Sequence, residues 1–264
     1  MEQSQLVPGQ EVTFGPIRFV ALALLAVALP LALLTTNIRV AFNTPQLYDY
    51  AVRRYDASAL SGIPQGELLR ANRELIRYFH DQRPFLFVTV RDGQGRLVSL
   101  FTPEETVHLA DVKALLRHLY RVQEGALAYV LVAVVAVFVW AQEGSVRQLA
   151  WTVLASTALC VAIVAGVAVA ATVGFDLFWS ALHNLLFTND LWRLDVTRHH
   201  LIQMFPEAFW FDAVMLIGGA TGAQMAILAL GAGAYLVLAP REPKGVATTA
   251  AFRVKPQVRG RPTP

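Results

Sequence analysis

Histidine is the side chain best suited to proton transfer near neutral pH, and His108 stands where a helix would bury it. In a helix His108 shares one face with an apolar stripe, so its ring is predicted to point inward. Asp111 lies three residues on, close enough to hold the ring and to favour its protonated form. The alternative is a core histidine whose polar atoms a nearby carboxylate satisfies. The stripe consists of Val112, Leu115, Leu116 and Leu119.

A second histidine, His183, lies in ALHNLLFTNDLWRLD at 181–195, which is rich in polar residues although apolar runs flank it. Polar residues recur there at helical spacing and predict a polar seam down a helix at membrane level. An ionisable group at that depth is costly and usually faces the bundle interior or a wet cavity, which makes the seam a candidate site. The alternative is an interfacial helix whose seam faces water, with Trp179 and Trp192 in an aromatic belt. The seam consists of Asp176, Ser180, His183 and Asn184.

The other reactive side chains do not form a recognisable metal or cofactor motif. His199 and His200 are adjacent, so on a helix their side chains point about 100° apart and make a poor metal pair. The sequence has no HExxH and no paired Cys/His zinc pattern. Its single cysteine, Cys160, lies in an apolar run that should keep the thiol protonated and inert. His118 lies off the apolar stripe and is expected on the surface. We therefore expect no cofactor and no metal ion.

The composition is that of a membrane protein, with 55% hydrophobic and 16% charged residues and a mean hydropathy of +0.47. A helix of about 18 or more uncharged residues can cross a bilayer core of about 30 Å. Three runs reach that length, and a shorter run at 125–141 is counted as a fourth crossing. Pro30 in the first run is tolerated where neighbouring helices satisfy the freed carbonyl. The sequence predicts an α-helical membrane protein, a four-transmembrane-helix bundle with a small α+β extracellular cap domain.

The distribution of Lys and Arg predicts the orientation. The segment 240–264 holds six of them against one acid, so it is expected to be cytoplasmic. Most of the net charge of +3 lies in this tail, which favours contact with anionic lipid rather than with nucleic acid. The first run offers no small-x-small cleavage site, so we expect it to be retained and not removed as a signal peptide. The expected order is a cytoplasmic N-terminus at 1–18, a first crossing at 19–39, the extracellular cap at 40–124, a second crossing at 125–141, a cytoplasmic loop at 142–148, a third crossing at 149–175, an extracellular or interfacial active-site hairpin at 176–212, a fourth crossing at 213–239 and a basic cytoplasmic tail at 240–264.

The cap carries signals for helices and for a hairpin. The segment 62–79 predicts a helix with one apolar side, and 84–101 alternates around an Asp-Gly turn, as a β-hairpin does. Thr102 as N-cap, Pro103 at the first position and Glu105 in a capping box predict the start of the helix that bears the first histidine. A cap of about 85 residues is too small to rely on its own core, so we expect it to lean on the bundle.

Four segments occur in a distinctive order between the crossings. They are TNIRVAFNTPQLYDY at 36–50, LLRANRELIRYF at 68–79, FTPEETVHLADVKALL at 101–116 and LHNLLFTNDLWRLDVTRHHLIQMFPEAFWFD at 182–212. From Leu31 to Asp212 the chain resembles the Lit family of lipoprotein intramolecular transacylases. One departure is LDVTRHH at 194–200, where the family pattern leads us to expect a proline after the aspartate. This departure changes a turn and touches neither histidine.

The resemblance implies a four-helix bundle with an outward cap in the bacterial cytoplasmic membrane, acting on diacylated lipoproteins. The implied reaction moves the sn-2 acyl chain of the diacylglyceryl-cysteine to the α-amino group of the same cysteine, which gives the N-acyl lyso form. The histidines of the E-x-x-H-L-x-D-V-K motif and of the segment before F-x-N-D-x-W are His108 and His183, which the resemblance implies are catalytic. We expect His183 to be the general base and His108 the acid or oxyanion partner, and these roles are open to exchange.

Six further residues are candidates to support the two histidines. A nearby carboxylate could raise the basicity of an imidazole, and polar side chains at the outer level could organise the headgroup and loops. The substrate brings both amine and ester, so no enzyme nucleophile is required, and GxSxG is absent. The alternatives are a non-catalytic membrane accessory that binds lipid or envelope proteins, and a lipid ester hydrolase. The supporting candidates are Asp111, Asp176, Asn189, Asp190, Asn37 and Arg39.

Overall fold

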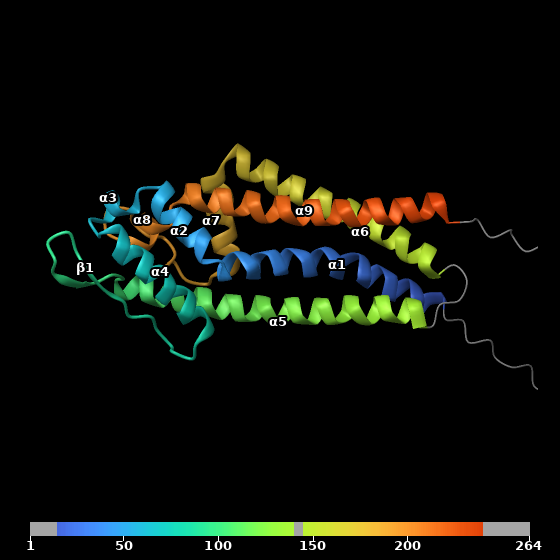
Figure 1. Cartoon of the computed structure of the whole chain (residues 1–264), viewed down its shortest axis with the longest axis horizontal. Coiled ribbons are helices and arrows are strands. Elements are labelled where there is room, and N and C mark those ends of the chain that lie inside the picture. Colours follow the sequence, from blue (N-terminus) through green and yellow to red (C-terminus); the bar gives the residue numbers. More distant parts are fainter. Residues whose placement is uncertain (1–14, 140–144, 240–264) are drawn as a thin grey trace, which may run out of the picture.

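Four long helices form a membrane bundle in the computed structural model, which describes residues 15–139 and 145–239 (Figure 1). All four are long and apolar enough to cross a membrane. Large apolar side chains cover the outside of the bundle; Leu230 and Val237, for example, are 74% and 83% exposed. The chain is therefore a multi-pass membrane protein, as its composition predicts. The helices are α1 (Gly15–Asn43), α5 (Pro103–Val139), α6 (Ser145–Val173) and α9 (Glu207–Leu238).

The helix α5 is longer than the crossing predicted at 125–141. It begins at Pro103, so the helix that carries His108 and the second crossing are one continuous element of 37 residues. Its charged middle turns are rich in Leu, Arg and Lys, which favour helix, and the single Gly125 does not interrupt them. A helix of this length measures about 55 Å, well beyond the roughly 30 Å of hydrocarbon, so its first half projects out of the membrane.

Parts of the predicted order lie outside the described residues. The basic tail at 240–264 does so wholly, and the segments predicted as N-terminus and cytoplasmic loop do so in part. The helix α1 continues through Pro30, as predicted for the first crossing.

The cap consists of three short helices and a hairpin at one end of the bundle (Figure 1). The amphipathic segment predicted at 62–79 is the helix α4 (Gln65–His80), which buries Leu68, Leu75 and Phe79. Its core is continuous with residues of the later chain, among them Phe205 and Phe209. The cap thus packs on the rest of the protein, as its small size predicts. The preceding helices are α2 (Pro45–Arg54) and α3 (Ala57–Ser61).

The hairpin pairs β1 (Thr89–Arg91) with β2 (Leu97–Ser99) in antiparallel register, as predicted. The turn differs in detail, because its positive φ of 78° falls at Gly95 and not at the glycine of the Asp-Gly pair. The Asp92 carboxylate holds the turn by accepting hydrogen bonds from the backbone N–H groups of Gln94 and Arg96, at 2.8 and 2.9 Å. This side-chain bracing replaces the tighter turn that the dipeptide suggested.

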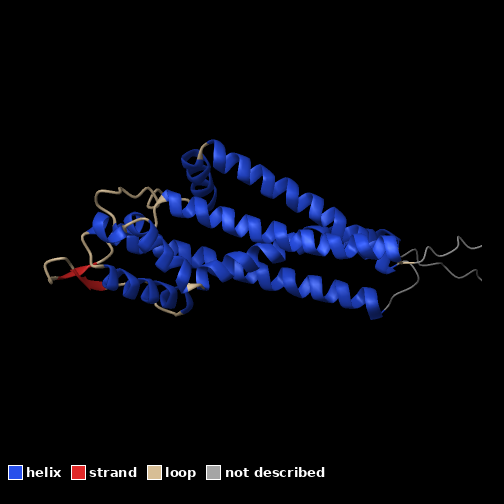
Figure 2. Cartoon of the chain, turned by 45° about the horizontal axis from the view of Figure 1, so that its top comes forward, coloured by secondary structure: helices blue, strands red, loops and turns tan. Residues whose placement is uncertain are grey.

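After α6 the chain turns sharply into α7 (Phe175–Leu186), which folds back against the bundle (Figure 2). A loop then leads to the single turn α8 (His200–Met204) and into α9. The helix α7 therefore comes close to the first turns of α5, although about 75 residues separate the two in sequence.

Candidate active site

An apolar cavity of about 450 Å³ lies where the cap meets the bundle. The stripe predicted on α5 forms one wall, because all of its residues line the cavity together with His108. Phe205, Phe209 and Trp210, from the α8 turn and the start of α9, form another wall. These aromatic side chains thus line a cavity large enough for an acyl chain.

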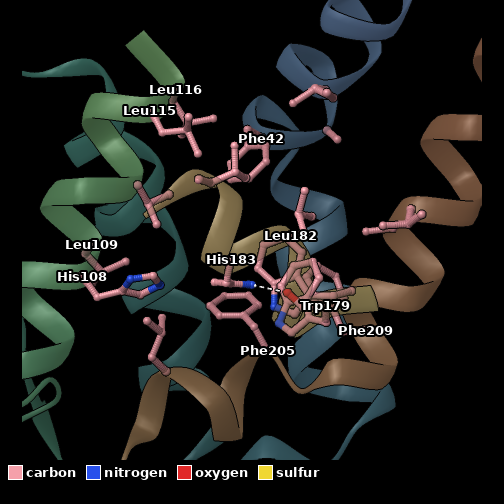
Figure 3. Close-up of a pocket in the computed structure, with 18 of the residues that line it drawn as sticks. Phe42, His108, Leu109, Leu115, Leu116, Trp179, Leu182, His183, Phe205 and Phe209 are labelled. Atoms are coloured by element: carbon pink, nitrogen blue, oxygen red, sulfur yellow. Dashed lines mark hydrogen bonds between the residues drawn. The ribbon is translucent and has the colours of Figure 1, made fainter. Parts of the chain in front are cut away.

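The two predicted histidines meet in this cavity. The rings of His108 and His183 lie 6.2 Å apart between centroids, at an interplanar angle of 32°. Phe187 contacts both, with centroids 5.2 Å from His108 and 5.6 Å from His183. Figure 3 shows the two imidazoles pointing toward one another from α5 and α7. A substrate group between them could contact both rings.

The environment of His183 fixes its tautomer. Nδ1 lies 2.9 Å from the backbone carbonyl oxygen of Trp179, one turn earlier on α7. A carbonyl can only accept, so Nδ1 carries the proton, and in the neutral ring Nε2 has the free lone pair. The rings of Trp179 and Trp192 enclose the imidazole, with centroids at 4.5 and 4.8 Å. His183 thus offers one basic nitrogen in an aromatic enclosure.

His108 is 7% exposed, and its Nδ1 is buried with no hydrogen-bond partner among the described residues. We expected Asp111 to hold this ring, and the structure differs. The Asp111 carboxylate accepts a hydrogen bond from Asn189 Nδ2 at 2.9 Å instead, which ties the loop after α7 to α5. Nδ1 of His108 is therefore a buried polar atom without a partner in the described part of the chain, an arrangement that is costly in free energy.

Both imidazoles lie outside the membrane-spanning segments, His108 in the projecting half of α5 and His183 in α7. Burial lowers the pKa of His183 below its usual 6.5, and the hydrogen bond to the Trp179 carbonyl opposes this only in part. Burial and, to a smaller extent, the nearby His183 lower the pKa of His108 to about 4, although Asp111 opposes the shift. Asp111 does favour the protonated form of His108, as expected, but burial outweighs it, so both rings are neutral at pH 7.

Of the polar seam predicted on α7, His183 alone lines the cavity. His183 shares its inward face with Trp179, Leu182 and Leu186, which all line the cavity. The first seam residue, Asp176, is exposed, and so is the last, Asn184. The apolar side of this helix faces inward because the cavity itself is apolar, and the histidine is the polar exception on it.

The remaining supporting candidates lie away from the imidazoles. Asn37 bonds to α9 within the bundle, and Arg39 pairs with Glu124 at 3.1 Å and stacks on Tyr120 at 4.6 Å. Asp190 pairs with Arg193 at 2.9 Å on the surface, where both side chains are more than half exposed. None of these three candidates lines the cavity.

Glu105 has a positioning role that the sequence pattern shows only in part. Its carboxylate closes the predicted capping box by accepting from the Thr102 backbone N–H at 2.7 Å. The other oxygen accepts from the Leu201 backbone N–H at 2.6 Å, and the side chain is fully buried. Glu105 therefore locks the α8 turn, whose Leu201 and Ile202 line the cavity, to the helix of His108.

The adjacent histidines bind different partners, as their spacing predicts. His199 Nδ1 accepts from the Asp195 backbone N–H at 2.8 Å, whereas His200 Nδ1 donates to the Leu100 carbonyl at 2.6 Å. His118 is exposed on α5 and bonds to the Ala114 carbonyl of its own helix at 2.8 Å. Over the parts of the chain that the structure describes, no three or more His, Cys, Asp or Glu side chains are grouped so that they could hold a metal ion.

Comparison with known proteins identifies the family. The model of the family lipoprotein intramolecular transacylase Lit matches residues 23–210, well over half of the chain. No curated protein matches the chain.

The chain is similar to a solved structure of the membrane integral lipoprotein intramolecular transacylase Lit from Bacillus cereus, with 20% identity, a TM-score of 0.68, and coverage of 84% of this chain and 97% of that one. A second structure of the Bacillus cereus enzyme, carrying a histidine-to-alanine substitution, gives 17% identity, a TM-score of 0.63, and coverage of 84% and 94%. The chain belongs to the Lit family of lipoprotein intramolecular transacylases.

Proposed function

We propose that this membrane enzyme moves the sn-2 acyl chain of a diacylglyceryl-cysteine lipoprotein to the α-amino group of the same cysteine. The observation that carries the proposal is the pair of imidazoles that face each other across one apolar cavity at 6.2 Å. The reaction breaks an ester and forms an amide, and the glycerol hydroxyl is released. The reaction needs a base that takes one proton from the attacking amine and passes it to the departing alkoxide. It also needs a hydrogen-bond donor that stabilises the oxyanion of the tetrahedral intermediate.

We assign the proton to His183. Its Nε2 is unprotonated in the neutral ring, because the Trp179 carbonyl holds the other proton on Nδ1. As the amine attacks the carbonyl carbon, Nε2 accepts the amine proton, and it then gives this proton to the departing glycerol oxygen. The ring ends neutral, as it began, so the enzyme needs no external acid or base.

We assign oxyanion stabilisation to His108. With a pKa lowered to about 4, this ring is neutral at pH 7 and acts as an N–H donor rather than as a charged acid. His108 was expected to act either as the acid or as the oxyanion partner. The lowered pKa favours the role of oxyanion partner. A fixed donor in a dry cavity is worth far more than one in water, because it does not have to reorganise during the reaction.

The apolar lining favours transfer over hydrolysis. The cavity wall is built from leucine, isoleucine and aromatic side chains, which exclude water from the ester carbonyl. The same surroundings favour the neutral form of the substrate amine, so it enters ready to attack. Amine and ester belong to one cysteine, and such proximity supplies a large share of the rate.

The positioning residues are those that hold the two histidines in place. Asn189 and Asp111 join the loop after α7 to α5, and Glu105 joins α5 to α8. We place the cap and the site on the outer face of the cytoplasmic membrane, because six Lys and Arg residues at 240–264 favour the cytoplasm.

The test uses the full chain expressed with a reporter lipoprotein whose N-terminal peptide is analysed by mass spectrometry. Wild type should convert the diacyl form to the N-acyl lyso form, and His183→Ala and His108→Ala should lose that product. Free fatty acid in place of the N-acyl product would show a hydrolase. Unchanged acyl transfer in both folded variants would refute the catalytic assignment, and no transfer by wild type would favour an accessory protein.

A further inference from the structure

A layer of hydrogen-bonded polar side chains lies deeper in the bundle than the cavity. Asn37 of α1 donates to Thr221 Oγ1 at 2.9 Å and to Gln224 Oε1 at 2.8 Å, both on α9. Gln123 of α5 donates to Thr36 Oγ1 of α1 at 3.1 Å. Thr221 and Gln123 are only 1% and 6% exposed. These five residues, here called the polar layer, join three of the four spanning helices.

The polar layer lies directly beneath the cavity. On each helix, a layer residue stands four positions from a cavity-lining residue and so lies on the same face, one turn away. The helix α1 runs toward the cap, whereas α5 and α9 run away from it, so the layer residue is on the membrane side in all three. The pairs are Asn37 with Ala41, Thr221 with Ile217, and Gln123 with Leu119.

An apolar chain that entered the cavity from the side of the cap would stop at the polar layer. Passing it would separate Asn37 from Thr221 and Gln123 from Thr36, which bond to each other across the helix interfaces. Each buried polar group left without a partner costs about 1–3 kcal/mol, and a methylene chain offers no hydrogen bond in return.

The depth and the volume of the cavity give similar estimates of the number of acyl-chain carbons that it can hold. Leu119 lies eleven residues after His108, about 16 Å along α5. At about 1.3 Å per bond, the advance of the protein backbone, this depth spans about 13 carbons. If each methylene takes about 30 Å³, the share of a water molecule in the liquid, the 450 Å³ cavity holds about 15. The cavity has room for one of the substrate's two acyl chains.

We infer that the polar layer is the floor that sets the longest acyl chain this enzyme transfers. The inference rests on the proposed function, because it places the reacting carbonyl between the imidazoles and the chain end at the layer. Chains up to the capacity of the cavity reach both at once. A longer chain that meets the floor holds its carbonyl above the imidazoles, so its transfer rate falls.

The test supplies purified enzyme in lipid vesicles with diacylglyceryl-cysteine lipopeptides that carry a graded series of sn-2 acyl chains. The rate of N-acyl product formation is measured by mass spectrometry for each chain length. In Asn37→Ala the amide group is lost while the other four residues of the polar layer stay in place, which frees the space of about one methylene, about 30 Å³, so the longest accepted chain should grow by about one carbon. In Ile217→Phe the floor rises, and the longest accepted chain should shorten.

Asn37→Ala leaves its main partner satisfied, because the Thr221 hydroxyl also donates to the Ile217 carbonyl at 2.8 Å. The matched controls are Val40→Ala on α1 and Ile227→Phe on α9, whose side chains are 56% and 68% exposed toward lipid. Both should keep the wild-type profile. If Asn37→Ala does not fold, Thr221→Ala tests the same floor, because it removes the layer side chain that Asn37 contacts on α9.

Two failures are distinguishable in this experiment. Wild type that transfers no chain of any length overturns the proposed function. Wild type that transfers, with the same length profile in every folded variant, overturns the assignment of the polar layer alone. Opposite shifts of the longest accepted chain in Asn37→Ala and Ile217→Phe, absent from both controls, support the assignment of the polar layer as the floor.

Discussion

The buried carboxylate of Glu105 provides the sharpest test of how the site is held together. Its two oxygens accept from two backbone N–H groups, Thr102 at 2.7 Å and Leu201 at 2.6 Å, and the side chain is fully buried. Glu105→Gln keeps the shape but has one accepting oxygen, so its amide N–H₂ faces one of these donors. A hydrogen bond to a charged group is worth about 1.5–3 kcal/mol, and the stranded N–H adds about 1–3 kcal/mol. Together these contributions predict a loss of about 2.5–6 kcal/mol in the free energy of unfolding.

The assay is the free energy of unfolding of the purified protein in mixed micelles titrated with a denaturing detergent. The matched control is Glu104→Gln, one residue earlier, whose side chain is 58% exposed and contacts His199 at 3.3 Å. His199 is buried, but the Glu104 carboxylate is more than half exposed, so solvent screens the pair and it contributes at most about 1 kcal/mol. The transfer rate should also fall in Glu105→Gln, because the α8 turn lines the cavity. Equal stability of the two variants would refute the account of Glu105 as the link between α5 and α8.

Two further predictions concern the catalytic pair and its support. At saturating substrate the transfer rate depends on neutral His183, whose pKa lies below 6.5, so the rate should persist through pH 6.5 and decline only at more acidic pH. A decline centred above pH 6.5 would show that a carboxylate favours imidazolium after all. Asn189→Asp places two carboxylates together and should lower the rate about tenfold, the equivalent of about 1.4 kcal/mol. Adding Asp111→Asn reverses donor and acceptor and should restore the rate, whereas a double variant as slow as the single one would contradict the role of this hydrogen bond.

The wall of the cavity was predictable from sequence because it lies on one helix. A period of 3.6 residues places His108 and its apolar stripe on one face, and that face lines the cavity. The capping box likewise fixes where α5 begins. Local rules of this kind depend only on neighbours within a turn or two.

The partners of these residues were not predictable, because they come from distant parts of the chain. Asp111 bonds to Asn189, 78 positions away, and no spacing rule connects the two. Periodicity also predicted the polar seam on α7 without showing which face of the helix is inward. The face that lines the cavity is the adjacent apolar one, which shares only His183 with the seam. The continuity of α5 was missed because a change from charged to apolar residues marks a change of solvent and not a break in the backbone.

That continuity has a mechanical consequence. One rigid rod carries both a membrane anchor and His108, so the imidazole stands at a fixed height above the start of the uncharged run at Gly125, about 25 Å along the axis. Bilayers of different thickness change how deeply such a rod sits or how far it tilts. The distance that the lipid of the substrate must rise out of the bilayer to reach His108 therefore depends on the thickness of the membrane. We expect the turnover rate to vary with bilayer thickness for this reason.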